Sequence, residues 1–563
     1  MHHPRRIAYF CMEVGYQASM PTYTGGLGIL AGDTLRSAAD LHLPVVAVTL
    51  LHRKGYFRQV LDAWGGQSEE PERWAVSDFL KETSARATVT IEGRTVHLRA
   101  WQFDVKGHGG FHVPVYFLDS ALDENAEADR TLTDHLYGGD TRYRLCQEII
   151  LGVGGVRILR ALGWRTLERY HMNEGHAALL AAELLDERLR AENRHDPSPN
   201  DLEAVRKQCI FTTHTPVPAG HDEFPPEQAA TIIEPRLCHV LGRIGCLDGS
   251  LNMTHLALKL SSYVNAVSRR HGEVSRKMFA GQHVDSITNG VHARTWVSPR
   301  IAELFDRYLP LWREETFTLR QAMRIPNHEL WGAHVHAKIL LLDYVNRTTG
   351  LVLDPQVFTI GFARRMAAYK RADLFLDDVA RLKQIHGVTG GIQIIYAGKA
   401  HPRDTGAKEI LRHVFRAREA LLPDVKLAFL TNYDMHVASR LVSGVDLWLN
   451  TPEPPMEASG TSGMKAAMNG VPSLSVLDGW WVEGCIENVT GWAIGRDGDG
   501  RDAVDRGATA EMIYDKLEHV ILPMYYHDRD RFIDIMRHAI AVNGSYFSTQ
   551  RMVHQYATRA YFR

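Results

Sequence analysis

Short apolar runs alternate with longer helical stretches along almost the whole chain. The apolar runs are rich in β-branched residues, and the stretches between them are typical of helices. Such an alternation is typical of parallel sheets whose two faces are covered by helices. It predicts an α/β fold built on doubly wound, Rossmann-like sheets, in which ligands bind at the carboxyl ends of the strands.

The strands expected from this pattern fall into two sets. The first half holds Ile7–Met12, Val45–Leu51, Val113–Phe117, Tyr170–Met172, Cys209–Thr213 and Val284–Ile287; the second half holds Val357–Phe362, Ile392–Ala397, Lys426–Leu430, Val445–Leu449 and Ser473–Val476. The expected helices are Leu27–Leu41, Arg142–Leu162, Gly175–Arg190, Ala372–His386, Ala407–Leu421, Met435–Val442 and Thr461–Gly470. Alternating residues around Glu92-Gly93 predict an edge hairpin over Ala87–Asp104, and the tail Ala508–Arg563 is expected to be mostly helical.

A chain of 563 residues is too long for one hydrophobic core, so two domains of about 250 residues each are expected. The order of the elements places the boundary near Asn289–Pro310. We expect an N-terminal α/β domain over residues 1–295 and a second Rossmann-like domain over residues 296–540. The helical tail, residues 541–563, is expected to pack back on the N-terminal domain.

Composition narrows the class of protein. The net charge of −2 indicates neither a polycationic surface for nucleic acid nor an acidic tail. The six cysteines form no CxxC pair, and the longest apolar run, Val45–Leu51, is too short to cross a membrane. These features predict a cytoplasmic protein with reduced thiols and with no nucleic-acid or membrane partner. None of the 29 histidines has an HExxH or ribbon spacing, so no metal is expected, and the polar loop Ile494–Asp505 is interpreted as a solvated turn.

The segment that carries most chemistry ends in a lysine: it reads Glu457-Ala458-Ser459-Gly460-Thr461-Ser462-Gly463-Met464-Lys465. Its small residues allow close backbone approach, and a helix-prone run follows. The N–H groups of residues 459–463 are expected to start a helix, where an anion is favoured. A lysine one turn into that helix is suited to form a Schiff base with an aldehyde cofactor. An ordinary glycine loop before a helix with a surface lysine is the alternative.

Two further segments follow predicted strands and carry groups that suit phosphate. Gly25-Gly26-Leu27-Gly28 opens a helix after the first strand, although a tight turn would explain it equally well. Arg364, Arg365, Lys370 and Arg371 follow a strand of the second half. Their alternative interpretation is a solvated basic turn. Their position at the carboxyl end of a strand favours binding of phosphoryl oxygens.

These segments together resemble the α-glucan (glycogen, starch and maltodextrin) phosphorylases over nearly the whole chain. The parts that match are Glu457–Thr461 with Met464-Lys465 and Asn469-Gly470, Phe211–Thr215, Thr288–Val291 with Trp296, and Tyr369-Lys370-Arg371. Asn173–His176 and Asp478–Trp481 resemble the shorter bacterial and archaeal branch of that family. Three positions depart from the long enzymes: Ala367-Ala368 replaces His-Glu, Arg364 replaces a lysine, and Asp434 replaces an arginine of the cofactor-phosphate region.

The resemblance implies a GT-B architecture, with two Rossmann-like domains and the active site in the cleft between them. It also implies pyridoxal 5'-phosphate as the cofactor, with Lys465 as the Schiff-base lysine. The residues implied for catalysis are Lys465, Arg365, Lys370, His214 and Tyr369. Those implied for cofactor binding are Lys465, Arg364, Lys370, Gly26, Thr461, Ser462, Gly463, Tyr433 and Trp296. Those implied for substrate binding are Gly25, Gly26, Leu27, Asn289, Glu457, Ala458, Ser459 and Gly460.

The implied reaction is a reversible, retaining phosphorolysis of terminal α-1,4-glucosyl units to α-glucose 1-phosphate. The implied partners are an α-glucan or maltodextrin and inorganic phosphate, with a homodimer or higher homo-oligomer as the assembly. Three alternatives stay open: phosphorolysis of another α-glucoside, a nucleotide-sugar glucan synthase, and a non-catalytic glucan-binding paralogue. The synthases pair two glutamates eight positions apart, whereas Lys465 stands eight positions after Glu457 here.

Overall fold

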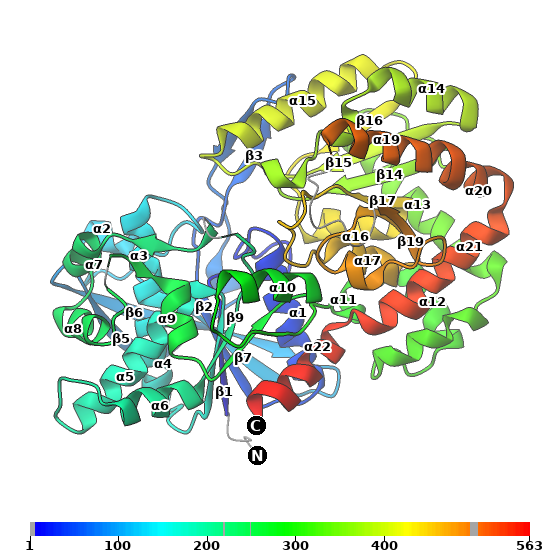
Figure 1. Cartoon of the computed structure of the whole chain (residues 1–563). Helices are drawn as coiled ribbons and strands as arrows, with labels where there is room; N and C mark the ends of the chain where they lie inside the picture. Colours follow the sequence, from blue (N-terminus) through cyan, green and yellow to red (C-terminus); the bar gives the residue numbers. More distant parts are fainter. Residues whose placement is uncertain (1–5, 218–219, 248, 496–504) are drawn as a thin grey trace.

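The computed structural model describes residues 6–217, 220–247, 249–495 and 505–563. These residues form two lobes, each built on a mainly parallel sheet with helices around it (Figure 1). The mixed α/β class with parallel sheets, predicted from the sequence, is therefore confirmed. The loop interpreted as a solvated turn lies largely at residues 496–504, outside the described residues.

The first sheet has nine strands and is parallel except at one edge. Its order is β13 (Asp285–Ser286), β12 (Tyr263–Ala266), β9 (Cys209–Thr212), β8 (Arg169–Asn173), β1 (Ile7–Phe10), β2 (Val45–Leu50), β7 (His112–Asp119), β6 (Arg94–Lys106) and β5 (Lys81–Ile91). The antiparallel edge is the expected hairpin, longer than predicted at both ends. It turns at Glu92 and Gly93, with φ of 51° and 74°, the left-handed pair that suits a tight hairpin.

The second sheet has six strands, all parallel. Its order is β16 (Lys426–Leu430), β15 (Ile392–Ala397), β14 (Phe358–Ala363), β17 (Leu447–Asn450), β18 (Ser473–Val476) and β19 (Gly491–Ile494). The chain runs outward from β14 to β16 and then returns to β17 on the other side of β14. The direction of winding thus reverses between β14 and β17, and the carboxyl ends of strands at such a point form a natural ligand site.

The helices surround the two sheets. Their bounds are α1 (Gly26–Asp40), α2 (Glu127–Arg130), α3 (Thr141–Ile149), α4 (Gly155–Ala161), α5 (Leu179–Ala191), α6 (Pro199–Gln208), α7 (Pro226–Ile232), α8 (Pro235–Arg243), α9 (Met253–Lys259), α10 (Arg269–Met278), α11 (Ala293–Trp296), α12 (Pro299–Tyr308), α13 (Asn327–Thr349), α14 (Val379–Thr389), α15 (Thr405–Leu421), α16 (Met435–Gly444), α17 (Ser462–Met468), α18 (Trp481–Gly484), α19 (Arg506–Lys516), α20 (Leu522–His527), α21 (Arg529–His538) and α22 (Thr549–Tyr556). Among the described residues, no helix is both long enough and apolar enough to span a bilayer.

Most predicted elements are found within a few residues of their expected bounds. The predicted helix Arg142–Leu162 is α3 and α4 joined by a π-helical turn, Ile150–Gly154. The sequence pattern missed β12, β19, a pair of two-residue strands, β10 (Glu223–Phe224) and β11 (Leu251–Asn252), and a small hairpin of β3 (Arg58–Leu61) and β4 (Gln67–Glu70). The β3–β4 hairpin alternates exposed and buried residues over only four positions per strand, too short a pattern to stand out.

The C-terminal tail lies against the first lobe. Figure 1 shows α22 beside that lobe, and the Ser37 hydroxyl of α1 lies 2.6 Å from the Thr549 hydroxyl. The buried Tyr556 and Tyr561 bond to Thr212 and His171 of the first sheet, at 3.1 and 2.8 Å.

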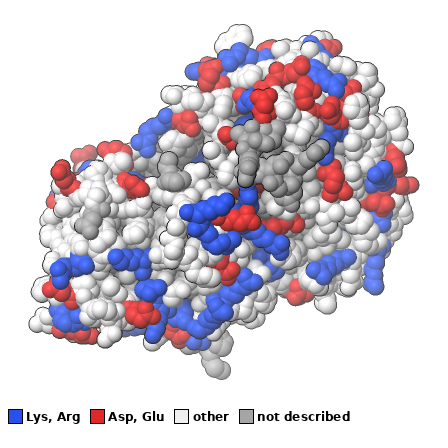
Figure 2. Space-filling model, in the orientation of Figure 1, with Lys and Arg blue, Asp and Glu red and all other residues white. Residues whose placement is uncertain are grey.

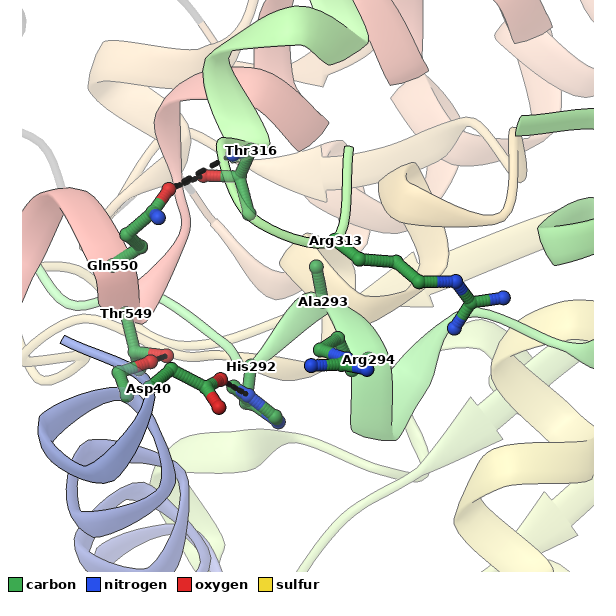
Figure 3. A pocket seen from close by; sticks show the side chains of 9 residues that line it. Asp40, His292, Ala293, Arg294, Arg313, Thr316, Thr549 and Gln550 are labelled. Atoms are coloured by element: carbon green, nitrogen blue, oxygen red, sulfur yellow. Dashed lines mark hydrogen bonds and ion pairs between the residues drawn. The ribbon is translucent and has the colours of Figure 1, made fainter. Parts of the chain in front are cut away.

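A small polar hollow lies where the tail, α1 and the connection between the lobes meet (Figure 3). His292 bonds to Asp40 at 2.9 Å on one side, and Thr316 bonds to Gln550 at 2.9 Å on the other. Its volume is ≈ 10 Å³, room for about one water molecule and none for a sugar or a phosphate. The hollow belongs to the joint between the lobes, and none of the predicted site residues lines it.

The packing of α1 leads to a test. A Cβ added to Gly32 would lie 2.0 Å from the carbonyl oxygen of Gly15, a backbone atom that has little room to move. We therefore expect Gly32→Ala to destabilise the protein by about 1–3 kcal/mol through overpacking. The melting temperature in differential scanning calorimetry should fall.

The matched control is Gly242→Ala in α8, where an added Cβ would meet no atom within 4 Å. Alanine favours a helix over glycine, so this variant should melt at the wild-type temperature or slightly above it. Equal melting temperatures for Gly32→Ala and the wild type would contradict the tight packing of α1.

Candidate active site

Two loops that the sequence singled out meet at the reversal point of the second sheet. The Arg364–Arg371 loop follows β14, and the loop from residue 451 to Thr461 follows β17. Arg364 Nη2 donates to Glu457 Oε2 at 2.6 Å, and Lys370 Nζ donates to the same oxygen at 2.5 Å. The structure therefore joins three predicted site residues in one buried ion cluster.

The charges of this cluster shape its chemistry. Burial alone would raise the pKa of Glu457, but the adjacent Lys370 and Arg364 charges outweigh burial and lower that pKa to about 2. Two cations share one carboxylate, so the cluster keeps a net positive charge. Within the described residues, Arg364 Nε and Nη1 are buried and have no hydrogen-bond partner. Unpaired buried donors are costly, and an anionic group beside Arg364 would satisfy them.

The glycine-rich turn after Glu457 starts the short helix α17, as expected. Thr461 precedes the first helical residue, Ser462, and Gly460 has a left-handed φ of 73°. A Cβ on Gly463 would lie 2.8 Å from the Trp480 ring, and one on Gly460 would lie 3.6 Å from it. The indole of Trp480 thus covers this turn and leaves no room for a side chain at position 463. At position 460, glycine is favoured because the backbone has a left-handed φ.

Lys465 is the buried amine of this site. Its side chain is 5% exposed and its Nζ lies 3.9 Å from the centre of the Trp296 ring. Burial lowers the pKa of Lys465 to about 8, and the charge of Asp33 opposes part of that shift. Trp296 is itself fixed by a 2.7 Å hydrogen bond from its Nε1 to Asp33. A lysine with a pKa near 8 has a substantial neutral fraction, the form that attacks a carbonyl.

Arg365 and Tyr369 lie beside the ion cluster on the same loop. Arg365 is exposed, with its Nη2 3.5 Å from the Tyr369 hydroxyl, and Lys370 Nζ lies 4.5 Å from the Tyr369 ring centre. Burial would raise the pKa of Tyr369, but these two cations turn the shift downward. Arg365 also acts across the lobes, since its charge opposes the burial-driven rise in the pKa of Tyr56.

Tyr433 and Asp434 precede α16. Burial raises the pKa of Tyr433 and the Arg364 charge opposes it, which places this tyrosine in the electrostatic reach of the predicted cofactor site. The carboxylate of Asp434 accepts the Val437 backbone N–H at 2.8 Å and caps the helix. The acid that replaces an arginine of the long enzymes thus has a local structural role.

The predicted Gly25–Leu27 turn lies at the start of α1, next to Glu13, a carboxylate that was not predicted from the sequence. Glu13 follows β1 and accepts the Thr24 backbone N–H at 2.6 Å and the Tyr137 hydroxyl at 3.0 Å. Burial raises the pKa of Glu13. An acid directly after the first strand was the signal available in the sequence, because the carboxyl end of a central parallel strand is where ligands bind.

His214 lies at the end of β9, next to a second carboxylate that was missed. His214 Nε2 is 2.7 Å from Asn173 Oδ1, and its backbone N–H donates to Glu174 Oε2 at 2.7 Å. Burial lowers the pKa of His214 to about 3, so the imidazole is neutral at physiological pH. Glu174 has φ of 81°, a strained value for a non-glycine residue that such bonds hold in place.

Asn289 and Ala458 lie where the lobes meet. The Ser268 hydroxyl of the first lobe donates to the Ala458 carbonyl at 2.6 Å, and Thr288 bonds to Glu483 of the second lobe at 2.9 Å. Asn289 Oδ1 is buried and has no partner among the described residues. Among the described residues, neither Gly25–Leu27 nor His214 forms a hydrogen bond with the cluster around Glu457.

Comparisons with known proteins agree with this arrangement. A family model described as carbohydrate phosphorylase matches residues 240–494. The maltodextrin phosphorylase of Thermococcus litoralis is 40% identical over 99% of this chain and 70% of its own length. The glycogen phosphorylases of Mycobacterium tuberculosis and Aquifex aeolicus are 36% and 34% identical, each over 99% of this chain, and over 71% and 86% of their own lengths. The chain belongs to the carbohydrate phosphorylase family.

Membership of the carbohydrate phosphorylase family confirms the resemblance inferred from the sequence motifs. The matched region, residues 240–494, contains Asn289, the basic loop after β14 and the turn before Lys465. The basic and acidic side chains of this phosphorylase are interspersed over the face seen in Figure 2, in keeping with a net charge of −2.

The buried amine of Lys465 gives a prediction about pH. Its folded-state pKa is about 8 against an unfolded value of 10.5, so at pH 7 its burial as a cation costs stability. In the cofactor-free protein, Lys465→Met should therefore raise the free energy of unfolding at pH 7 by about 2–3 kcal/mol. Between pH 8 and 10.5 the unfolded chain binds more protons than the folded chain. The free energy of unfolding of the wild type should therefore rise with pH relative to that of the variant.

Denaturation curves at pH 7, 8.5 and 10 would measure this difference, with Lys277→Met as the control. Lys277 is exposed on α10, so its replacement should leave the pH dependence of stability unchanged. A Lys465→Met variant that is less stable than the wild type at pH 7 would contradict the assignment of a costly buried amine.

Proposed function

We propose that this member of the carbohydrate phosphorylase family is an α-glucan phosphorylase that uses pyridoxal 5'-phosphate. It would transfer terminal α-1,4-glucosyl units to inorganic phosphate, reversibly and with retention, to give α-glucose 1-phosphate. The observation that carries the proposal is the cationic cluster of Arg364, Lys370 and Glu457 with unpaired arginine donors, followed along the chain by the low-pKa Lys465 on α17. The relatives named maltodextrin and glycogen phosphorylase support the substrate class.

The architecture proposed is of the GT-B type. The two domains would be residues 1–295 and residues 296–540, with residues 541–563 returning to the first domain. Two parallel sheets whose strand ends carry the predicted residues support this division. The active site would lie in the cleft between the domains, which fits the hydrogen bonds that join Ser268 to Ala458 and Thr288 to Glu483 across the lobes.

The residues present fit pyridoxal phosphate. Lys465 would hold its aldehyde carbon, and the spare donors of Arg364 would take its phosphate together with Lys370. The other groups proposed to surround it are Gly26, Thr461, Ser462, Gly463, Tyr433 and Trp296. When bound, this cofactor would supply a second phosphate group that exchanges a proton with the substrate phosphate.

Inorganic phosphate would bind to Arg365, Lys370 and the backbone N–H groups of Gly25, Gly26 and Leu27. Arg365 is exposed at the loop and its charge reaches the first lobe, so it is placed to meet an anion that enters between the lobes. Lys370 would then contact both the phosphate and the Glu457 carboxylate. Cations around the phosphate oxygens favour the charge that builds up as the glycosidic bond breaks.

The glucosyl unit would be held by Glu457, Ala458, Ser459, Gly460, Asn289, His214 and Tyr369. Three of these offer groups suited to sugar hydroxyls: the ionised Glu457, the unpartnered Oδ1 of Asn289 and the neutral imidazole of His214. Tyr369 would contact the 2-position of the sugar. Hydrogen bonds from this set would orient the anomeric carbon toward the phosphate.

The position of Lys465 argues against a nucleotide-sugar glucan synthase. It stands eight residues after Glu457, where the synthases carry their second donor-site glutamate. Phosphorolysis of another α-glucoside is the nearer alternative, because acceptor specificity depends on loops rather than on the cluster described here.

Incubation with inorganic phosphate and either maltodextrin, a disaccharide panel, UDP-glucose or ADP-glucose tests the proposal. We expect α-glucose 1-phosphate from phosphate and the α-1,4-glucan, and chain extension when glucose 1-phosphate and a primer are supplied. Product from a disaccharide alone would change the substrate but not the reaction. Glucan extension from a nucleotide sugar, without any phosphorolysis, would overturn the proposal.

Arg365→Ala and Lys370→Ala should each weaken phosphorolysis while the protein stays folded. Loss of one charge-assisted contact to phosphate costs about 1.5–3 kcal/mol, which corresponds to about a 10–150-fold fall in kcat/KM for phosphate. The control is Lys383→Ala on α14, whose lysine pairs with Asp424 at 3.0 Å outside the site. If either active-site variant kept the wild-type kcat/KM, the phosphate-binding role proposed for that residue would be wrong.

A further inference from the structure

A turn after β18 holds the loop that carries Glu457. Asp478 Oδ2 accepts the backbone N–H of Glu457 at 2.8 Å, and its Oδ1 accepts the backbone N–H of Gly479 at 2.9 Å. The Asp478 side chain is almost fully buried, with 2% of the residue exposed. Both carboxylate oxygens are therefore committed to backbone groups, one of them on the residue that bonds to Arg364 and Lys370.

The same turn holds the next residues of the loop. The Trp480 backbone N–H donates to the Ser459 carbonyl at 2.9 Å. Gly479 has φ of 55°, and a Cβ there would lie 2.3 Å from the Ser459 carbonyl oxygen. The turn can approach the loop this closely only because position 479 lacks a side chain. Asp478, Gly479 and Trp480 thus form one clamp on residues 457–459.

The residue at position 478 is an acid although a neutral side chain would avoid charge repulsion there. Asp478 and Glu457 repel each other, so a neutral residue would avoid an electrostatic cost at this buried position. A carboxylate has what an amide lacks, namely two acceptor oxygens that can each receive a backbone N–H. The geometry therefore favours a residue that fixes the Glu457 backbone over one that only fills space.

We propose that Asp478 is a positioning residue for the phosphorylase reaction, which directs the Glu457 carboxylate by holding the Glu457 backbone N–H. Glu457 has a flexible side chain. The hydrogen bond from its backbone N–H to Asp478 fixes the position of the backbone from which that side chain extends. The inference rests on the proposed function, because Glu457 is the residue proposed to meet both the cations and the sugar. Asp478 itself would touch neither substrate nor cofactor.

The pH dependence follows from the groups around Asp478. Burial raises the pKa of Asp478 to about 7; the N–H bonds from Glu457 and Gly479 and the Arg270 charge of α10 lower it, and the Glu457 charge raises it. As pH falls through 7, protonation removes one acceptor oxygen and loosens the bond to the Glu457 amide. Affinity for a neutral sugar should therefore fall as the pH is lowered from 8 to 6.

The experiment uses the full-length holoenzyme and compares the wild type with Asp478→Asn. Asparagine keeps the size of the side chain but can accept only one of the two N–H bonds. We expect kcat/KM for the glucan to fall about tenfold or more, while the cofactor absorbance band stays unchanged. Calorimetric titration with glucose, a neutral probe, should show the fall in affinity between pH 8 and 6 in the wild type and a flat profile in the variant.

A double-mutant cycle with Glu457→Gln tests whether Asp478 acts through Glu457. In the Glu457→Gln background, adding Asp478→Asn should lower kcat/KM by less than half of the factor by which it lowers kcat/KM in the wild type. The control is Asp378→Asn, where the acid accepts the Arg381 N–H at 2.8 Å and caps α14 away from the site. This control should keep wild-type kinetics.

Two results would overturn the inference: an Asp478→Asn enzyme within twofold of the wild type, or an equal fold-loss with and without Glu457→Gln. If Asp478→Asn does not fold, the wild-type titration still decides, because constant glucose affinity between pH 6 and 8 contradicts the role. Absence of glucose 1-phosphate from the wild-type enzyme would instead refute the proposed function.

Discussion

Glu457 places one carboxylate between the half-buried Arg364 and the buried Lys370, at the point where the second sheet reverses its direction of winding. Two cations held largely away from water without an anion would be destabilising, so the free protein depends on this carboxylate. The same cluster retains a net positive charge and spare arginine donors. Stability of the free protein and the phosphate binding proposed above would therefore come from one arrangement of three side chains.

The segment after Glu457 leads from this cluster to the buried Lys465. Glycine at positions 460 and 463 lets the chain pass beneath Trp480 before it enters the helix of Lys465. Trp296 lies against the Lys465 amine and is fixed by Asp33 of the first lobe. The amine is thus kept dry by groups from both lobes, and burial lowers its pKa toward neutrality.

Sequence patterns predicted the strands best where both faces of the strand are buried. Ile392–Ala397, Lys426–Leu430 and Ser473–Val476 were placed at their observed bounds, and all of their residues except the first lysine are buried. The strand Gly491–Ile494 begins with glycine and the strand Tyr263–Ala266 contains a buried asparagine, so neither run stood out. Neither Glu13 nor Glu174 was assigned to the site from the sequence, although Glu174 lies in the Asn173–His176 motif, because a single acid after a strand is a weak signal by itself.

The sequence by itself determined the α/β class, the strand ends that carry the chemistry and the lysine after a glycine-rich turn, since these are properties of neighbouring residues. The tertiary structure decided which charges meet: Arg364 and Glu457 are 93 residues apart and come together only because β14 and β17 are adjacent in the sheet. It also decided that Asp434 caps α16 and that the Lys465 side chain is buried away from solvent. Burial and long-range pairing depend on the whole packed chain, and no local pattern encodes them.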